Sequence, residues 1–244
     1  EIAQCLVGSE MCIRDRMKLE YYKKALALMV IPFFIASCEL LGLDYQDSYD
    51  YDYSAGMPSN KIDMSAFEFI KSRTDIFSLL EEAILYAGVE NEFKQSGVTY
   101  LLPTNTAFNS ETSTDLSYFQ THQLTYIDEE TGELVSYAPI SMTAYPKEQV
   151  KEFLLYHIVK GKYTFTNLPA EPTWFETVAT ADTAKINMYL LKDRNPNIVF
   201  NNFDGHYKSS IKPRTSNLYN ADGSYMHVMD SWLDRPTKEQ LNMK

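Results

Sequence analysis

The stretch VTYLLPTNTAF, residues 98–108, decides the fold. It opens with a run of apolar, β-branched and aromatic residues, which is typical of a buried β-strand. Pro103 ends this strand, because proline has no backbone N–H to donate to a neighbouring strand. Asn105 can hold the following turn through its side chain. We expect Ala107 and Phe108 to begin a helix there, with Phe108 as an anchor of the hydrophobic core.

Amphipathic helices are predicted on both sides of this strand. Between Ile76 and Ala87, apolar residues recur at steps of three and four, with Thr74 or Asp75 as the N-cap and Gly88 at the C-cap position. Further helices are expected at 66–71 and 147–159.

Strand patterns fill the last third of the chain. Apolar and polar residues alternate in four segments, which are 175–179, 186–191, 198–203 and 225–230. The polar, loop-rich stretch 109–146 contains a hairpin pattern, with strands at 122–127 and 134–137 and a turn at Thr131-Gly132. Helices and strands together predict an α/β (α+β) fold.

The composition is that of a folded, acidic domain. The chain has 244 residues, of which 45% are hydrophobic and 23% are charged, and this is enough to bury a sizeable core. A formal net charge of −11 repels phosphate backbones, so we expect no nucleic-acid partner. Beyond residue 37, Cys38 is the only cysteine, so the domain has no internal disulfide and depends on its core.

Two segments at the start of the chain are expected to stand outside the folded domain. Residues 1–16 resemble a translated sequencing-adapter read-through, and the alternative is a genuine disordered extension. We take Met17 as the start of a signal peptide, residues 17–37, in which a basic region precedes an apolar run. The run covers the 11 residues 25–35 and is too short to span a bilayer as a helix.

The apolar run ends in Ile35-Ala36-Ser37-Cys38, which resembles the lipobox of bacterial lipoproteins. Small residues let a peptidase close around the backbone, and the Cys38 thiol takes the diacylglycerol. The alternative is a buried helix that ends in cysteine. We expect a membrane anchor at Cys38, since each acyl CH₂ contributes about 0.8 kcal/mol. The protein is then expected in the cell envelope, at the outer membrane, with exposure at the cell surface as a further hypothesis.

Residues 38–61 form an acidic, Tyr/Asp-rich tether in this interpretation. Like charges keep such a segment extended, so it can serve as a solvated spacer. Alternatively, its acidic residues near the lipidated cysteine resemble the surface-sorting signals of Bacteroidota lipoproteins. The predicted domain covers 62–236, and residues 237–244 are expected to form a C-terminal tail.

Four blocks of sequence resemble the fasciclin (FAS1) domain family in the family's order. They are DIFSLL with AGV (75–80 and 87–89), VTYLLPTNTAF (98–108), FLLYHIVKGKY (153–163) and GSYMHVMDSWL (223–233). The second is similar to the family's strand followed by Pro-Thr-Asn-x-Ala-Phe, and the fourth to its closing Gly-x-x-His-x-Ile-Asp. The insert 109–146 and the stretch 195–213 depart from the family, so ligand-contacting loops there are not inherited by analogy.

The resemblance implies a twisted β-wedge or small sandwich with helices packed alongside. The residues that match its motifs are Pro103, Thr104, Asn105, Phe108, His227 and Asp230. It also implies a contact site at Tyr156-His157, because the matching pair in animal relatives is implicated in cell adhesion. The alternative for both residues is structural packing, with His157 satisfied by hydrogen bonds in the middle of its helix.

The sequence contains no recognisable catalytic motif. It lacks a Gly-x-Ser-x-Gly elbow and a glycine-rich phosphate loop, and its four histidines lack the spacing of metal ligands. We therefore expect no enzyme, metal or cofactor. A hydrolase stays open as the least favoured alternative, because the paired carboxylates of a glycosidase come together only in the folded chain.

The favoured function is cell adhesion or surface binding of a protein or glycan. An accessory subunit of an outer-membrane nutrient (glycan) uptake assembly is the alternative. Aromatic side chains that can stack on sugars or belong to the core are Trp174, Phe175, Tyr207 and Tyr219.

Overall fold

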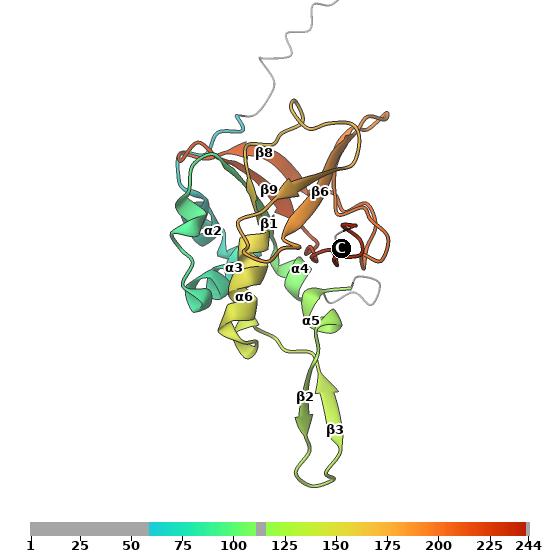
Figure 1. The fold of residues 1–244 in the computed structure, drawn as a ribbon. Helices are drawn as coiled ribbons and strands as arrows, with labels where there is room; N and C mark the ends of the chain where they lie inside the picture. Colours follow the sequence, from blue (N-terminus) through green and yellow to red (C-terminus); the bar gives the residue numbers. More distant parts are fainter. Residues whose placement is uncertain (1–58, 111–115, 243–244) are drawn as a thin grey trace, which may run out of the picture. The chain divides into compact units, whose positions relative to one another are not determined.

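Strand β1 (Val98–Pro103) lies at the centre of the fold, and all six of its residues are buried. The computed structural model describes residues 59–110 and 116–242. Within them, β1 belongs to a four-stranded mixed sheet in the order β4-β1-β9-β8 (Figure 1). The other strands of this sheet are β4 (Ile158–Lys160), β8 (Thr215–Tyr219) and β9 (Tyr225–Met229).

The first strand of the domain, β1, and its last strand, β9, meet in this sheet. β1 and β9 pair in parallel, with Pro103 opposite Met229, whereas β4 and β8 pair antiparallel to their neighbours. Strand β8 is absent from the sequence prediction. Its register shifts between Thr215 and Leu218, and Asn217 takes a left-handed φ of 61°. This irregularity hides the period of two that identifies a strand.

A second, antiparallel sheet consists of β5 (Thr173–Glu176), β6 (Lys185–Leu191) and β7 (Asn197–Phe200). It joins the first sheet at one corner, where the Val178 N–H donates to Ile158 O at 2.8 Å. Two sheets that share one corner form the expected wedge.

Two of these strands end earlier than the sequence predicts. β5 stops at Glu176 and not at residue 179, and β7 stops at Phe200 and not at residue 203. The next residue after β7, Asn201, has a φ of 45°, which breaks the extended backbone.

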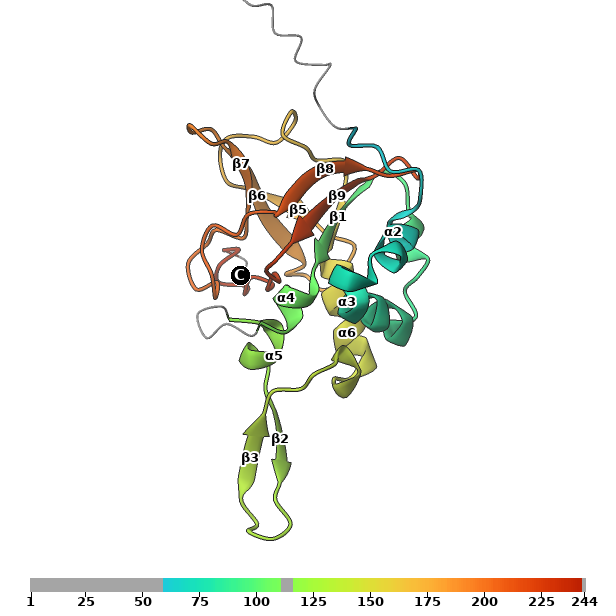
Figure 2. The same ribbon diagram turned by 180° about the vertical axis from the view of Figure 1, so that it is seen from behind.

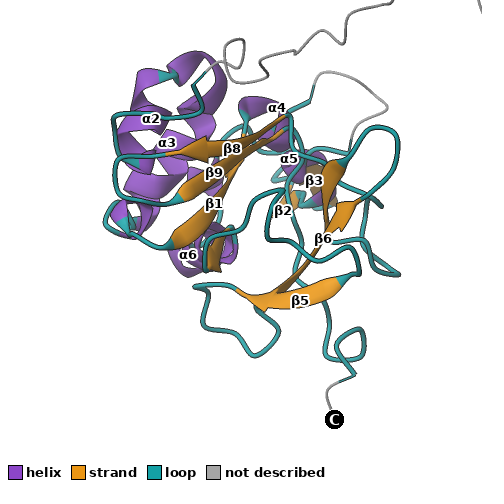
Figure 3. Cartoon of the chain, turned by 90° about the horizontal axis from the view of Figure 1, so that it is seen from above, coloured by secondary structure: helices purple, strands orange, loops and turns teal. Residues whose placement is uncertain are grey.

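Helices α2 (Ala66–Ser72), α3 (Thr74–Ala87) and α6 (Lys147–Tyr156) cover one side of the four-stranded sheet. Figure 3 shows them gathered on that side of β8, β9 and β1, with β5 and β6 on the other side. Shorter helical segments are η2 (Glu92–Lys94), α4 (Asn105–Phe108), α5 (Tyr118–Thr121) and η3 (Met142–Ala144).

The predicted apolar stripe of α3 is buried, and Gly88 closes the helix in the left-handed conformation with a φ of 72°. The predicted N-cap is wrong. Thr74 is already helical, and Arg73 precedes it without a side-chain cap bond. A capping box lies one helix earlier, where Ser65 and Glu68 bond to each other's backbone N–H at the start of α2.

Helix α6 is shorter than predicted. It ends at Tyr156, so His157 caps it instead of lying in its middle, and Ile158 and Val159 belong to β4. The β-branched pair favours a strand, and the His157 carbonyl accepts the Leu101 N–H of β1 at 2.9 Å. The sheet therefore overrides the helical pattern.

One hydrophobic core joins these elements. Leu102, Phe108, Leu154 and Val228, one or two from each of the last three blocks, belong to a single buried cluster and are 4% exposed at most. The predicted α+β class is confirmed, as is Phe108 as a core anchor. Asn60 O, just before the predicted domain start, accepts the Tyr219 N–H of β8 at 2.8 Å.

The predicted hairpin in the insert is confirmed. It consists of β2 (Leu124–Ile127) and β3 (Leu134–Tyr137), and Figures 1 and 2 show it projecting away from both sheets. Its turn is closed by a Gly132 N–H bond to Asp128 O at 2.8 Å. Among the residues described, no helix has the length and apolarity needed to cross a membrane.

Candidate functional site

Thr104 and Asp230, two of the motif residues, bond to each other. The Thr104 hydroxyl donates to Asp230 Oδ1 at 2.8 Å, and the Thr104 N–H donates to Met229 O at 2.8 Å. The Arg214 guanidinium lies 3.6 Å from the same carboxylate oxygen. These contacts fasten the end of β1 to the end of β9, so the second and fourth blocks are joined.

Asn105 does not hold a local turn, contrary to the prediction from its residue type. Its Oδ1 accepts the Leu79 N–H at 3.0 Å, and its Nδ2 donates to Ser78 Oγ at 3.0 Å. Both partners lie in α3. Asn105 therefore connects the second block to the first, which sequence spacing alone does not reveal.

His157 is buried and bonded at both ring nitrogens. Its Nδ1 lies 2.8 Å from Phe153 O, and its Nε2 lies 3.2 Å from the Leu233 backbone N. A carbonyl only accepts and a backbone N–H only donates, so the ring is neutral with its proton on Nδ1. Burial lowers the pKa of His157 to about 4, although the bond to Phe153 opposes the shift. The ring joins the third block to the fourth.

Tyr156 is equally buried. Its hydroxyl lies 3.1 Å from both Lys185 O and Asp234 O, and it accepts a bond from Asn201 Nδ2 at 3.0 Å. Burial raises the pKa of this hydroxyl above its usual range. Asn201 also bonds to Asp234 O at 2.8 Å and receives the Asn187 N–H on its Oδ1 at 3.1 Å. Asn201 carries no signal in the sequence, because only its left-handed backbone marks it.

His227 has a different set of partners. Its Nε2 lies 3.1 Å from Tyr163 O, and its Nδ1 accepts the Asn217 N–H at 3.3 Å. Burial lowers its pKa to about 4. His227 bonds to Asn217 and Tyr163, whereas Asp230 contacts Thr104 and Arg214, so the two residues serve separate structural contacts.

The candidate contact pair Tyr156-His157 presents almost no surface to a partner. Both residues are 1% exposed, and every polar atom of their side chains has an internal partner. These contacts favour the structural role over direct contact. The predicted lipidation site, Cys38, lies outside the described residues.

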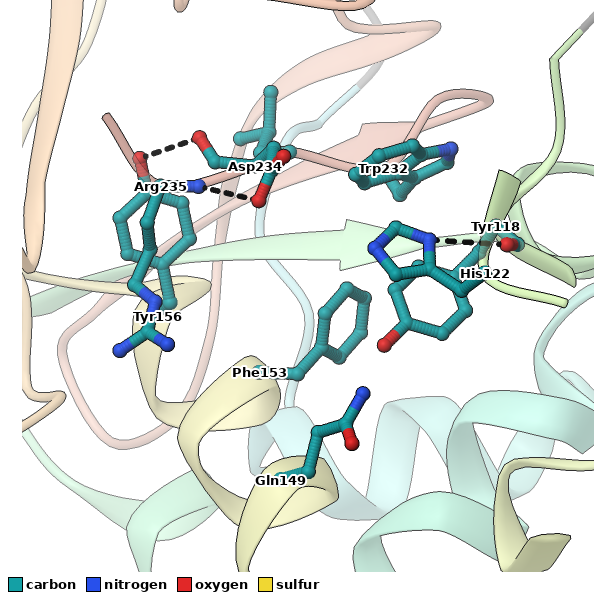
Figure 4. Close-up of a pocket in the computed structure, with 9 residues that line it drawn as sticks. Tyr118, His122, Gln149, Phe153, Tyr156, Trp232, Asp234 and Arg235 are labelled. Carbon is teal, nitrogen blue, oxygen red and sulfur yellow. Dashed lines mark hydrogen bonds between the residues drawn. The ribbon is translucent and has the colours of Figure 1, made fainter. Parts of the chain in front are cut away.

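A pocket of about 110 Å³ opens beside Tyr156, between the end of α6, helix α5 and the chain after β9 (Figure 4). Rings form much of its wall, and polar groups line the rest. Its lining residues are Tyr118, His122, Gln149, Phe153, Tyr156, Trp232, Leu233, Asp234 and Arg235.

The pocket's aromatic wall is built from rings that contact one another. His122 stacks on Tyr118 with ring centroids 4.1 Å apart, and Trp232 meets His122 edge-on at 4.9 Å. Tyr207 stacks behind Trp232 at 4.0 Å, and its hydroxyl donates to Trp232 O. On the polar side, the Arg235 guanidinium lies 3.5 Å from a Glu152 carboxylate oxygen. The size and lining suit a small polar group and not an extended chain.

The four aromatic residues proposed for sugar stacking do not form one platform. Each is half-buried and packs against another ring: Trp174 on Phe203, Phe175 on Tyr163, Tyr207 on Trp232, and Tyr219 on Tyr225. Tyr219 lines a shallow pocket of about 250 Å³ together with Lys61 and Lys162.

Metal binding finds no support within residues 59–110 and 116–242, where no three His, Cys, Asp or Glu side chains form a group able to hold an ion. The carboxylates of Glu129 and Glu130 lie exposed in the turn of the hairpin. Neither residue lines the pocket beside Tyr156 or the pocket beside Tyr219.

No protein-family model and no curated protein matches the chain. Among solved structures, it is similar to a FAS1 domain pair from the insect cell adhesion molecule fasciclin I. The identity is 12% and the TM-score is 0.46. The match covers 72% of this chain and 52% of the other, so the chain spans about half the length of that domain pair.

Proposed function

We propose that this chain is a membrane-tethered, extracytoplasmic lipoprotein whose fasciclin-like domain acts in cell adhesion or in surface binding of a protein or glycan. One observation carries the fasciclin-like part of this proposal. The side chains that match the family's motifs bond from block to block: Asn105 to the first, Thr104 to the fourth, and His157 to the fourth.

These bonds support a shared scaffold, because each needs two separate blocks to be present together. A chance match of short motifs would leave such polar side chains in unrelated places. The acidic charge of the domain and the internal hydrogen bonds at both ring nitrogens of His157 and His227 favour binding over catalysis. The tether rests on the sequence around Cys38 alone.

Membrane anchoring is tested with the Cys38→Ala variant of the full chain. The proposal expects the wild-type chain in the membrane fraction, labelled by a fatty-acid probe, and the variant unlabelled and released. A wild-type chain without label, or a variant that stays in the membrane fraction, contradicts the lipid anchor.

Binding is tested with the released Cys38→Ala chain, on intact cells and on glycan arrays. The proposal expects saturable binding that the heat-unfolded chain lacks. Uniformly negative arrays remove the glycan version, and absence of cell binding removes adhesion.

A second candidate function is that of an accessory subunit in an outer-membrane uptake assembly. The projecting hairpin favours it, because an exposed extension suits permanent contact with another subunit. Purification of the chain from detergent-solubilised membranes distinguishes the two. A stoichiometric partner supports the subunit role, whereas a monodisperse chain without one contradicts it.

A further inference from the structure

The exposed apolar surface of the domain is concentrated in one place. Seven large apolar side chains are exposed among the described residues, and five of them lie in the segment 123–140, which we name the arm. These five are Tyr126, Ile127, Leu134, Tyr137 and Ile140, with exposed fractions from 42% to 81%. Exposed apolar clusters of this kind mark interaction surfaces in soluble domains.

Both faces of the arm carry apolar side chains. The strand register places Tyr126 opposite Val135 and, next along, Leu124 opposite Tyr137 on one face. The rings of Tyr126 and Tyr137 meet edge-on at 5.8 Å. On the other face, Ile127 lies directly opposite Leu134.

The described part of the chain leaves these faces open to solvent. Figures 1 and 2 show the arm extending beyond α6 and away from both sheets. An isolated two-stranded hairpin in water is marginally stable at best, so an arm with two apolar faces gains stability when a partner covers it.

The negative charge at the tip of the arm indicates which kind of partner can cover it. Four carboxylates, those of Asp128, Glu129, Glu130 and Glu133, lie at the tip, and the arm contains no lysine, arginine or histidine. A second copy of the arm, the acidic residues of segment 44–52 and an anionic membrane would each bring like charge to this tip. A basic rim around an apolar groove complements both features.

We propose that the arm inserts into an apolar groove, rimmed by lysine or arginine side chains, on another protein. This inference names the partner class of the binding function proposed above and rests on it. Insertion buries both faces of the hairpin at once, and the acidic turn meets the rim. The root of the arm is braced for such a role, because the Tyr145 hydroxyl donates to His122 O at 2.6 Å.

Site-specific photocrosslinking in the source cells tests this. The full chain carries p-benzoylphenylalanine in place of Ile127, and a control chain carries it in place of Leu85, which is 51% exposed on α3. The inference expects a crosslinked protein from the arm position only, with the crosslinked partner peptide apolar and flanked by basic residues. The same chain with Glu129→Lys and Glu130→Lys should lose the adduct.

Four results overturn the inference: no adduct from the arm, an adduct with a second copy of this chain, an adduct with lipid, or equal adducts from both positions. Cell binding provides a second measurement. Ile127→Ser with Leu134→Ser should weaken it at least about tenfold, as expected for loss of two central contacts, whereas Leu85→Ser should leave it unchanged. Unchanged binding by the double variant rejects the arm but keeps the binding function; no binding by the wild-type chain rejects the binding function itself.

Discussion

The four blocks and the arm use their side chains in opposite ways. In the blocks, polar residues such as Thr104 and His157 are buried and bonded to other blocks. In the arm, apolar residues such as Ile127 and Leu134 stand in solvent, 67% and 70% exposed. Buried polar residues thus join the blocks around the hydrophobic core, and exposed apolar residues mark the surface that we propose as a contact.

The largest expected effect comes from opening the core. Phe108→Ala removes a side chain with 0% exposure and should lower the free energy of unfolding by about 3–5 kcal/mol. Ile127→Ala in the arm should change it by about 0.5 kcal/mol or less. Urea denaturation measures both. Similar losses for the two variants would show that the arm belongs to the cooperative core.

The next effect concerns pH. The folded-state pKa values of His157 and His227 lie near 4, below the unfolded value of 6.5, because burial disfavours the charged ring. The unfolded chain therefore binds more protons between pH 6.5 and 4. The contribution of the two neutral rings to the free energy of unfolding should be complete above pH 6.5 and should fall as the pH drops toward 4. The loss should be roughly 3 kcal/mol for each histidine, at 1.4 kcal/mol per pKa unit.

Comparing wild type with His157→Gln checks this, since carboxylates elsewhere affect both chains equally. The urea midpoints of the two chains should converge as the pH falls from 8 to 4, because the variant lacks the titration of His157. Parallel curves for the two chains would mean that the His157 ring titrates normally and is not held neutral.

A smaller effect is expected at Asn201. Asn201→Ala leaves the buried Asn187 N–H and Asp234 carbonyl without this partner and places alanine at a positive φ. We expect a loss of about 2–3 kcal/mol. The matched control is Asn195→Ala, at an exposed turn, which should stay within about 0.5 kcal/mol. Thermal unfolding compares them, and equal melting temperatures would refute the structural role.

The smallest global effect is expected in the arm. The Asp128 carboxylate accepts the N–H groups of Glu130 and Thr131, and these bonds lower its pKa. Asp128→Ala should speed hydrogen exchange in the turn without moving the melting temperature. A clear fall in melting temperature would join the arm's turn to the folding unit.

The sequence was sufficient to predict the elements that depend on local pattern. The stripe of α3, the strand before Pro103 and the hairpin with its turn at Gly132 follow from spacing and turn chemistry, and the structure confirms them. The predicted end of α6 was wrong, because a long-range hydrogen bond from the Leu101 N–H to the His157 carbonyl places the following residues in the sheet. Short-range pattern contains no information on such contacts.

The sequence predicted the strands of the proposed contact surface but not which of their faces is exposed. The alternation in β2 and β3 identifies the strands, but both faces include apolar residues, so the pattern does not say which face is covered. The pocket beside Trp232 was missed because its walls come from α5, α6 and the chain after β9. The parallel pairing of β1 with β9, which brings the blocks together, also depends on the whole chain.

Native-state hydrogen exchange tests the central claim most directly. If the four blocks form one cooperative unit and the arm stands outside it, the amides of Leu101, Thr104 and Leu233 should exchange only by global unfolding. The amides of 124–137 should exchange by local opening at much lower free energy. Equal protection of the arm and the blocks, or block amides that exchange independently of one another, would contradict the account.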